Sequence, residues 1–125
     1  KEIKVDVWGS GKPKREFLHV DDLADGILKV LELNHKEFRD LVGKDINHIN
    51  IGSGSDLSIK ELALMIKKIT GSKSKINFDK SKPDGVKRKL LNISKMKKIK
   101  WRPKYTLNSG IKKFYIWYLE SLKSK

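Results

Sequence analysis

The sequence contains no cysteine, only three histidines and no hydrophobic run long enough to span a bilayer. Without cysteine the chain has neither a disulfide framework nor a thiolate metal site. His19, His35 and His48 do not have the spacing of metal ligands either, so we expect no metal site. Because no leader-like or membrane-spanning segment is present in these residues, we expect a cytoplasmic protein.

Glycine loops that bind nucleotides are also missing. Gly52-Ser-Gly54 has the first two glycines of a G-x-G-x-x-G loop, but Leu57 stands at the third glycine position. Gly9-Ser-Gly11 fails in the same way, and there is no phosphate loop that ends in lysine. No arrangement of a nucleophile and a base is recognisable. We therefore predict that the chain carries no catalytic residue and binds no cofactor by itself.

What the sequence has in excess is positive charge. Its 29 Lys and Arg residues outnumber 15 Asp and Glu residues, which gives a net charge of +14. Such a charge raises the hypothesis of a nucleic-acid-binding module. Most of the excess is lysine spread along the whole chain, which is more typical of a solvated surface. Lys87, Arg88 and Lys89 differ, because they form a cluster directly after the turn at Pro83-Asp84-Gly85.

Hydrophobic periodicity predicts strands that alternate with helices. We expect strands at 3–8, 15–19, 46–51 and 75–78; helices at 20–31 and 59–70, from Ser94 and from Thr106; and a loop or frayed helix end at 34–45. Asp21 or Asp22 is expected as the N-cap or as a first-turn acid of the helix at 20–31. The other expected N-caps are Ser58 in a capping box with Glu61, Ser94 and Thr106. This alternation predicts an α/β fold with at least one parallel pair of strands.

Three types of side chain suggest a ligand site. Trp8 falls on the polar face of the first strand, where it would either form a stacking platform or cover the edge of a neighbouring element. A guanidinium and an ammonium near an aromatic ring suit a phosphorylated ligand. For Arg15, Arg88 and Lys89 the pattern leaves ligand binding and surface exposure open, whereas Lys14 and Lys87 are expected to be surface charges.

Two motifs carry a family resemblance. The stretch WGSGKPKREFLHVDD (8–22) and the stretch FDKSKPDGVKRKLLNISKM (78–96) closely resemble the C-terminal part of the GDP-L-fucose synthase family. HINIGSG (48–54) and SIKELA (58–63) extend the similarity over nearly the whole chain. These enzymes are NADPH-dependent epimerase/reductases that belong to the extended short-chain dehydrogenase/reductases.

The resemblance implies a C-terminal substrate-binding subdomain, residues 1–125, whose N-terminal Rossmann core, with its cofactor loop, serine and Tyr-x-x-x-Lys pair, lies outside this chain. It implies that Trp8, Arg15, Asp84 and Lys89 bind the GDP-sugar, with Arg15 and Lys89 on the diphosphate. Leu90, Leu91 and Ile93 would then pin the turn to the core. The full enzyme would use NADP(H) and form a homodimer away from membranes, and the isolated chain would be inactive.

Two positions depart from the family pattern. Asn92 replaces the usual Asp, and Lys100 replaces the usual Gly at a helix end where glycine readily takes a left-handed conformation. At Lys100 we therefore expect the local backbone to differ from that of the family. The chain does not begin with Met and opens within a predicted strand, so we expect it to be part of a longer protein. The alternatives are the substrate domain of another nucleotide-sugar epimerase/reductase and, on charge alone, the nucleic-acid module.

Overall fold

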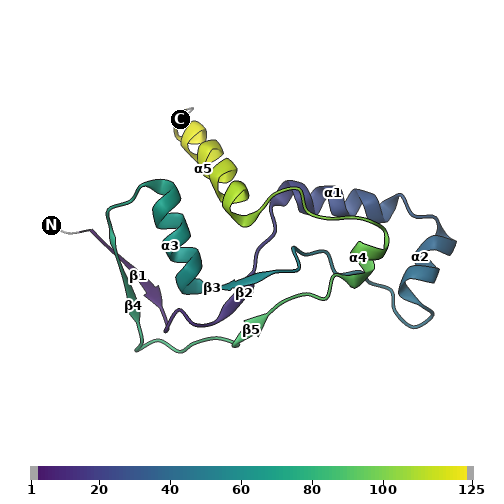
Figure 1. The fold of residues 1–125 in the computed structure, drawn as a ribbon, viewed down its shortest axis with the longest axis horizontal. Helices are drawn as coiled ribbons and strands as arrows, with labels where there is room; N and C mark the ends of the chain where they lie inside the picture. The colour runs from purple at the N-terminus through teal and green to yellow at the C-terminus, as the bar shows by residue number, and fades with distance from the viewer. Residues whose placement is uncertain (1–2, 124–125) are drawn as a thin grey trace.

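The computed structural model describes residues 3–123 and has a mixed α/β architecture (Figure 1). Its elements follow the chain in this order: β1 Lys4–Trp8, β2 Lys14–Glu16, α1 Val20–Leu31, α2 His35–Val42, β3 Asp56–Ser58, α3 Ile59–Thr70, β4 Lys75–Asp79, β5 Arg88–Lys89, α4 Ser94–Lys98 and α5 Leu107–Lys123. The strand predicted at 3–8 is therefore present as β1; residues 1–2, which extend the same pattern, lie outside the described residues. No helix within 3–123 is long and apolar enough to cross a membrane.

The strands form two small sheets, and both contain a parallel pair. β1 pairs with β4 in parallel, with Lys4 opposite Lys75 and Trp8 opposite Asp79. The second sheet has the order β3-β2-β5, in which β2 is antiparallel to β3 and parallel to β5. The prediction of an α/β fold with at least one parallel pair is confirmed.

Several helix boundaries follow from local sequence as expected. α3 begins with a capping box in which Ser58 and Glu61 bond each other's backbone amides, and it ends at Gly71, which has φ +66°. Before α5, the Thr106 hydroxyl accepts a hydrogen bond of 3.2 Å from the amide of Ser109. These helix ends were predictable because each cap uses residues within four positions.

Two segments differ from the prediction. The expected loop at 34–45 contains α2, which begins with a second capping box between Asn34 and Glu37 and places Phe38, Leu41 and Val42 at helical spacing. The strand expected at 46–51 is wrong, because this segment pairs with no strand among the described residues. Alternating hydrophobic residues favour an extended chain, but a strand also needs a partner.

Of two further expectations, Asp21 and Asp22 as acids in the first turn of α1 are confirmed, whereas the Ser94 cap is wrong. The N-cap of α1 is His19, whose Nδ1 accepts a hydrogen bond of 3.2 Å from the amide of Asp21. Asp21 instead accepts a 2.6 Å hydrogen bond from Lys113 Nζ, which joins α1 to α5. At α4 the N-cap position is Ile93, and the amide of Ser94 donates to Asn92 Oδ1.

Asp22 connects two distant segments rather than capping its own helix. Its side chain is only 1% exposed, and its two oxygens accept hydrogen bonds of 2.9 and 3.0 Å from the amides of Lys104 and Tyr105. A buried carboxylate that is satisfied by two backbone amides fixes both partners in place. The loop before α5 is thereby held against α1.

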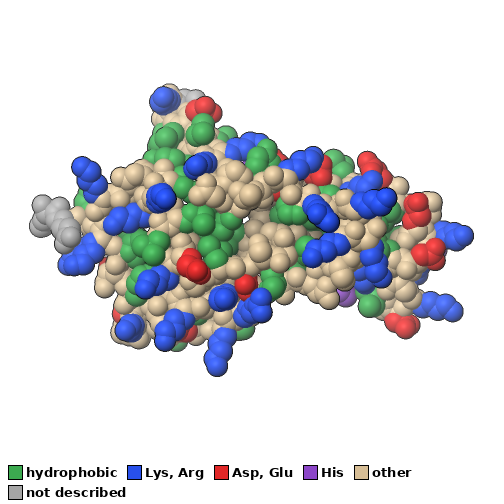
Figure 2. Space-filling model, in the orientation of Figure 1, with side chains coloured by type: hydrophobic (Ala, Val, Ile, Leu, Met, Phe, Trp, Pro, Cys, Tyr) green, Lys and Arg blue, Asp and Glu red, His purple; other side chains and the backbone are tan. Residues whose placement is uncertain are grey.

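The buried core lies beside α1 and α4. Its buried hydrophobic side chains are Val42, Ile93, Met96 and Trp101. The Trp101 indole donates a 2.8 Å hydrogen bond to Asp25, and a Cβ at Gly26 would meet this indole ring. α3 packs against α5 away from this core, and hydrophobic side chains gather between these two helices (Figure 2).

Lys100 has a left-handed conformation, although the replacement of the family's usual glycine led us to expect a different local backbone. Its φ is +60°, and it follows α4 directly. Because a left-handed conformation costs a residue with a Cβ roughly 1–2 kcal/mol, we expect Lys100→Gly to raise the free energy of unfolding by about 1 kcal/mol. Lys98→Gly, at the last residue of α4, should lower it instead. Urea unfolding followed by circular dichroism checks both, and a loss of stability in Lys100→Gly would contradict the first expectation.

Removing the Asp22 carboxylate tests the connection between α1 and the loop before α5. Asp22→Ala leaves two amides without partners in a buried place, so we expect a loss of about 2–4 kcal/mol in the free energy of unfolding. The control is Asp40→Ala on the exposed surface of α2, which should stay within about 0.5 kcal/mol of the parent. Equal midpoints for the two variants in urea would show that Asp22 contributes little.

Candidate functional site

The candidate site lies where two connections run side by side. One connection, 9–13, joins β1 to β2, and the other, 80–87, joins β4 to β5. Because β1 pairs with β4 and β2 pairs with β5, both connections start and finish next to each other (Figure 1). Backbone hydrogen bonds from Gly9 to Asp79 (2.9 Å) and from Lys14 to Lys87 (2.8 Å) close the two ends.

Trp8 stands at the start of the first connection. Its side chain is 74% exposed. This agrees with its predicted place on the polar face of the strand. Of the two alternatives left by the sequence, this exposure agrees with an available aromatic surface, since no described element covers the ring. The ammonium of Lys82 lies 5.5 Å from the centre of the ring.

Asp84 joins the two connections at their middle. Its Oδ1 accepts a 2.7 Å hydrogen bond from the amide of Ser10, and its Oδ2 accepts a 2.6 Å hydrogen bond from the Ser10 hydroxyl. These bonds from Ser10 favour the charged carboxylate and hold the pKa of Asp84 below its usual value. Gly9, with φ +84°, permits this approach, because a Cβ there would collide with the carboxylate.

Arg15, in β2, contacts the second connection near the residues that lead into β5. Its Nη1 donates hydrogen bonds of 2.7 Å to the carbonyl oxygens of Lys14 and Val86. Nε and Nη2 make no hydrogen bond to another described residue. The guanidinium therefore has a structural contact on one nitrogen and donors left for a ligand on the other two.

Arg88 and Lys89 have different surroundings in the structure, whereas the sequence left the same two alternatives open for both. Arg15 and Lys89 are opposite each other in the β2–β5 pair, so both side chains leave the same face of the sheet. Arg88 leaves the other face and forms an ion pair with Asp56, whose side chain is 7% exposed. This pair lowers the pKa of Asp56 and raises that of Arg88. Lys89 has no such partner among the described residues.

The surface assignments of two other lysines agree with the structure. Lys14, the first residue of β2, and Lys87, which directly precedes β5, are both exposed. Among the described residues of the β2–β5 pair, the ammonium of Lys89 and the partly free guanidinium of Arg15 thus lie on one face.

Anchoring of the turn differs from the prediction. Only Ile93 of the three expected apolar residues is buried, while Leu90 and Leu91 are 37% and 44% exposed. The amide of Leu91 instead donates a 2.9 Å hydrogen bond to Glu16 Oε2. The segment after β5 is therefore held by a backbone contact as well as by the core.

Sequence reasoning missed the role of Glu16. Its Oε1 accepts hydrogen bonds from the amide of Gly54 (2.6 Å) and the hydroxyl of Ser53 (3.2 Å), in addition to the bond from Leu91. A Cβ at Gly52 would meet the same carboxylate. The only local sign of this role was the carboxylate in the motif R-E-F of the predicted strand. Its hydrogen-bond partners lie 37 to 75 residues away in the sequence, so the pairing could not be inferred from neighbouring residues.

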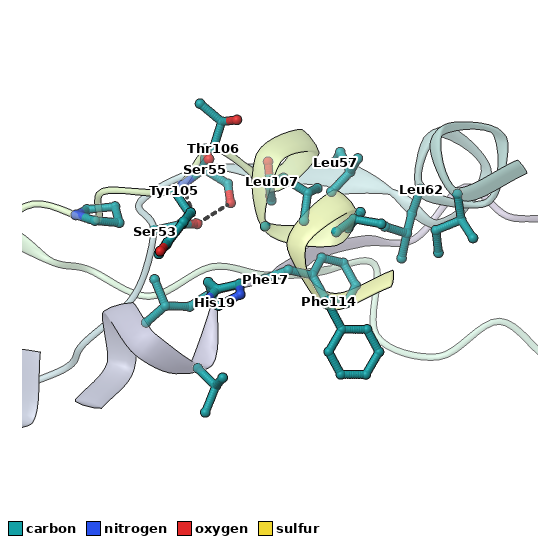
Figure 3. A pocket seen from close by; sticks show the side chains of 17 residues that line it. Phe17, His19, Ser53, Ser55, Leu57, Leu62, Tyr105, Thr106, Leu107 and Phe114 are labelled. Atoms are coloured by element: carbon teal, nitrogen blue, oxygen red, sulfur yellow. Dashed lines mark hydrogen bonds between the residues drawn. The ribbon is translucent and has the colours of Figure 1, made fainter. Parts of the chain in front are cut away.

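A separate groove of about 620 Å³ lies among β3, α3, α5 and the segment before α1 (Figure 3). Phe17, Leu57, Leu62 and Phe114 give it an apolar lining, and His19 and Tyr105 lie at one end. None of the four expected ligand residues lines this groove. It is therefore distinct from the candidate site.

Known proteins resemble this chain over most of its length. The family model described as GDP-mannose 4,6 dehydratase matches residues 1–114. GDP-L-fucose synthase of Escherichia coli (strain K12) is 44% identical over 117 residues, which is 94% of this chain and 36% of that protein. Probable GDP-L-fucose synthase 1 of Oryza sativa subsp. japonica is also 44% identical, over 97% of this chain and 34% of its own length.

Solved structures give the same picture. A GDP-6-OMe-4-keto-L-xylo-heptose reductase from C. jejuni is 41% identical, with a TM-score of 0.84, over 95% of this chain and 34% of that one. MlghC, a GDP-mannoheptose C4 reductase from Campylobacter jejuni with NADP bound, is 44% identical with a TM-score of 0.77, over 93% of this chain and 35% of its own.

The chain spans about a third of the length of the relatives that it matches. Their names and folds confirm the resemblance to GDP-L-fucose synthases and to the extended short-chain dehydrogenase/reductases. With residues 1–114 matched by the family model, the chain belongs to the GDP-mannose 4,6-dehydratase family.

Proposed function

We propose that this chain is the GDP-sugar-binding part of a longer NADPH-dependent epimerase/reductase that converts GDP-4-keto-6-deoxy-D-mannose to GDP-L-fucose. The observation that carries the proposal is the shared face of Arg15 and Lys89, next to an Arg88 that is already paired with Asp56. The names of the relatives at 44% identity support the substrate. We place this enzyme in the cytoplasm, as a homodimer whose contact lies mainly outside residues 1–125.

In this proposal Arg15 and Lys89 hold the diphosphate. The Nε and Nη2 atoms of Arg15 would donate to phosphate oxygens, while Nη1 keeps its bond to Val86. The Lys89 ammonium would add a point charge from the neighbouring strand. Trp8 would pack against the nucleotide, and Asp84 would accept from a ligand hydroxyl through lone pairs that Ser10 leaves free.

NADPH would supply the hydride, but the glycine turns of this chain do not fit that cofactor. The carboxylate of Glu16 occupies the space beside Gly52 and accepts a hydrogen bond from the amide of Gly54. A cofactor phosphate at this glycine turn would have to bind in the same place. At Gly11 a Cβ would collide with Phe78. We therefore assign cofactor binding and proton transfer to residues outside this chain, and expect the isolated chain to be inactive.

A second candidate is a reductase for a different GDP-sugar. It is favoured by the similarity to a GDP-heptose reductase with a TM-score of 0.84 and to the GDP-L-colitose synthase of Yersinia pseudotuberculosis, which is 37% identical. The phosphate-binding residues would be the same in both cases, since they contact no sugar. The nucleic-acid module has only the net charge in its favour.

Substrate panels separate the two enzyme candidates. We expect the full-length protein to oxidise NADPH with GDP-4-keto-6-deoxymannose and to release GDP-L-fucose, followed by absorbance at the NADPH band and by chromatography of the sugar product. A GDP-4-keto-heptose and a GDP-4-keto-3,6-dideoxyhexose serve as competing substrates. Higher kcat/KM with either of these would replace the proposed substrate.

Variants of the two cations test the binding role. We expect Lys89→Ala in the full-length enzyme to raise KM about 10-fold or more, because a charge-assisted hydrogen bond contributes roughly 1.5–3 kcal/mol. Arg15→Ala should act in the same direction, and Arg15→Lys should recover only part of the loss. Lys87→Ala, which removes an exposed charge two residues away, is the matched control. Unchanged KM and kcat in Lys89→Ala would remove Lys89 from the site.

A further inference from the structure

Lys82 has an unusual position at the end of the site farthest from Lys89. Its ammonium lies 5.5 Å from the centre of the Trp8 ring, and both side chains are exposed. Its backbone amide donates to the carbonyl of Asp79, which fixes the turn that carries it. An exposed indole with a cation over its face is an arrangement that attracts planar, electron-rich ligands.

The charge of Lys82 is not neutralised by the acidic residues around it. Oδ1 of Asp79 accepts hydrogen bonds from the amide and the hydroxyl of Ser81, at 3.0 and 2.6 Å. Asp84 is bonded to Ser10 through both of its oxygens. Lys82 forms no ion pair with a described residue, so its donors are available to a ligand.

The order of the side chains along the site matches the order of groups in a nucleotide. Lys82 and Trp8 lie where β1 and β4 finish, whereas Lys89 and Arg15 lie on the β2–β5 pair at the other end of the connections (Figure 1). With the phosphates on Arg15 and Lys89, an aromatic base would extend toward Trp8. Lys82 and Lys89 are seven positions apart, which is a span of no more than roughly 25 Å in an extended chain.

We propose that Trp8 and Lys82 form the base subsite and that Lys82 selects guanine over adenine. The base would stack on Trp8, and the displaced ammonium would move to the edge of the base. Guanine presents two acceptors there, O6 and N7, which suit an ammonium that has only donors. Adenine presents the N6 amino donor in place of O6, so it offers Lys82 one acceptor fewer. This inference rests on the proposed function and assigns it a residue that reads the base.

Binding of three free nucleotides to the full-length protein tests the inference by isothermal titration calorimetry. GDP and IDP share O6 and N7, IDP lacks the 2-amino group, and ADP lacks O6. We expect Lys82→Met to weaken GDP and IDP about tenfold, the loss of one good base-edge contact, and to change ADP by less than about twofold. Lys80→Met removes an exposed lysine of the same turn that has no contact with Trp8, and it should leave all three affinities unchanged.

A second background tests the pairing with Trp8. In Trp8→Leu, which loses the stacking surface, Lys82→Met should weaken GDP by less than about threefold, because the base is no longer held beside the ammonium. An equal loss for GDP and ADP in Lys82→Met would place Lys82 on the phosphates and overturn the inference. The same tenfold loss with and without Trp8 would also overturn it.

Other outcomes separate this inference from the proposed function. If Lys89→Ala weakens GDP while Lys82→Met does not, the binding site stands and only the base-reading role of Lys82 is wrong. If the unmodified protein binds ADP as tightly as GDP, or binds neither, the proposed GDP-sugar function fails and the inference fails with it.

Discussion

The parallel pairing of β1 with β4 and of β2 with β5 is the constraint on which the rest of the structure depends. Parallel strands cannot be joined by a tight turn, so the chain between them has to form α1, α2, β3 and α3 before it returns. The return is what places connection 80–87 beside connection 9–13. Ser10 and Asp84 then join the two at the middle, and the candidate ligand residues are distributed along the resulting edge.

Two carboxylates hold distant segments of the chain in place by accepting hydrogen bonds from backbone amides. Glu16 binds the chain at Gly54 and at Leu91, and Asp22 binds it at Lys104 and Tyr105. Each carboxylate satisfies amides that no helix or strand satisfies, which allows irregular segments to pack against β2 in the case of Glu16 and against α1 in the case of Asp22. The glycines at 9 and 52 leave room for Asp84 and Glu16, so these turns serve the internal structure of the chain.

Features that depend on near neighbours were predictable from the sequence, and features that depend on distant partners were not. The α3 capping box and the Thr106 cap follow from residues within a few positions. The Asn34–Glu37 box carried the same kind of local signal and was overlooked. The ion pair of Arg88 with Asp56 and the three bonds of Glu16 could not be predicted, because they exist only once β2, β3 and β5 are assembled.

The distance along the chain between paired strands also sets the order in which the molecule can form during synthesis. Val5 and its partner Ile76 are 71 residues apart, which takes a ribosome roughly 4 to 14 s to make. α1 and α3, whose hydrogen bonds are local, can form as they emerge, whereas β1 has to wait for β4. The edge that carries Trp8, Arg15 and Lys89 can therefore acquire its native structure only after α1, α2 and α3 have been made, whereas α4 and α5 follow it from the ribosome.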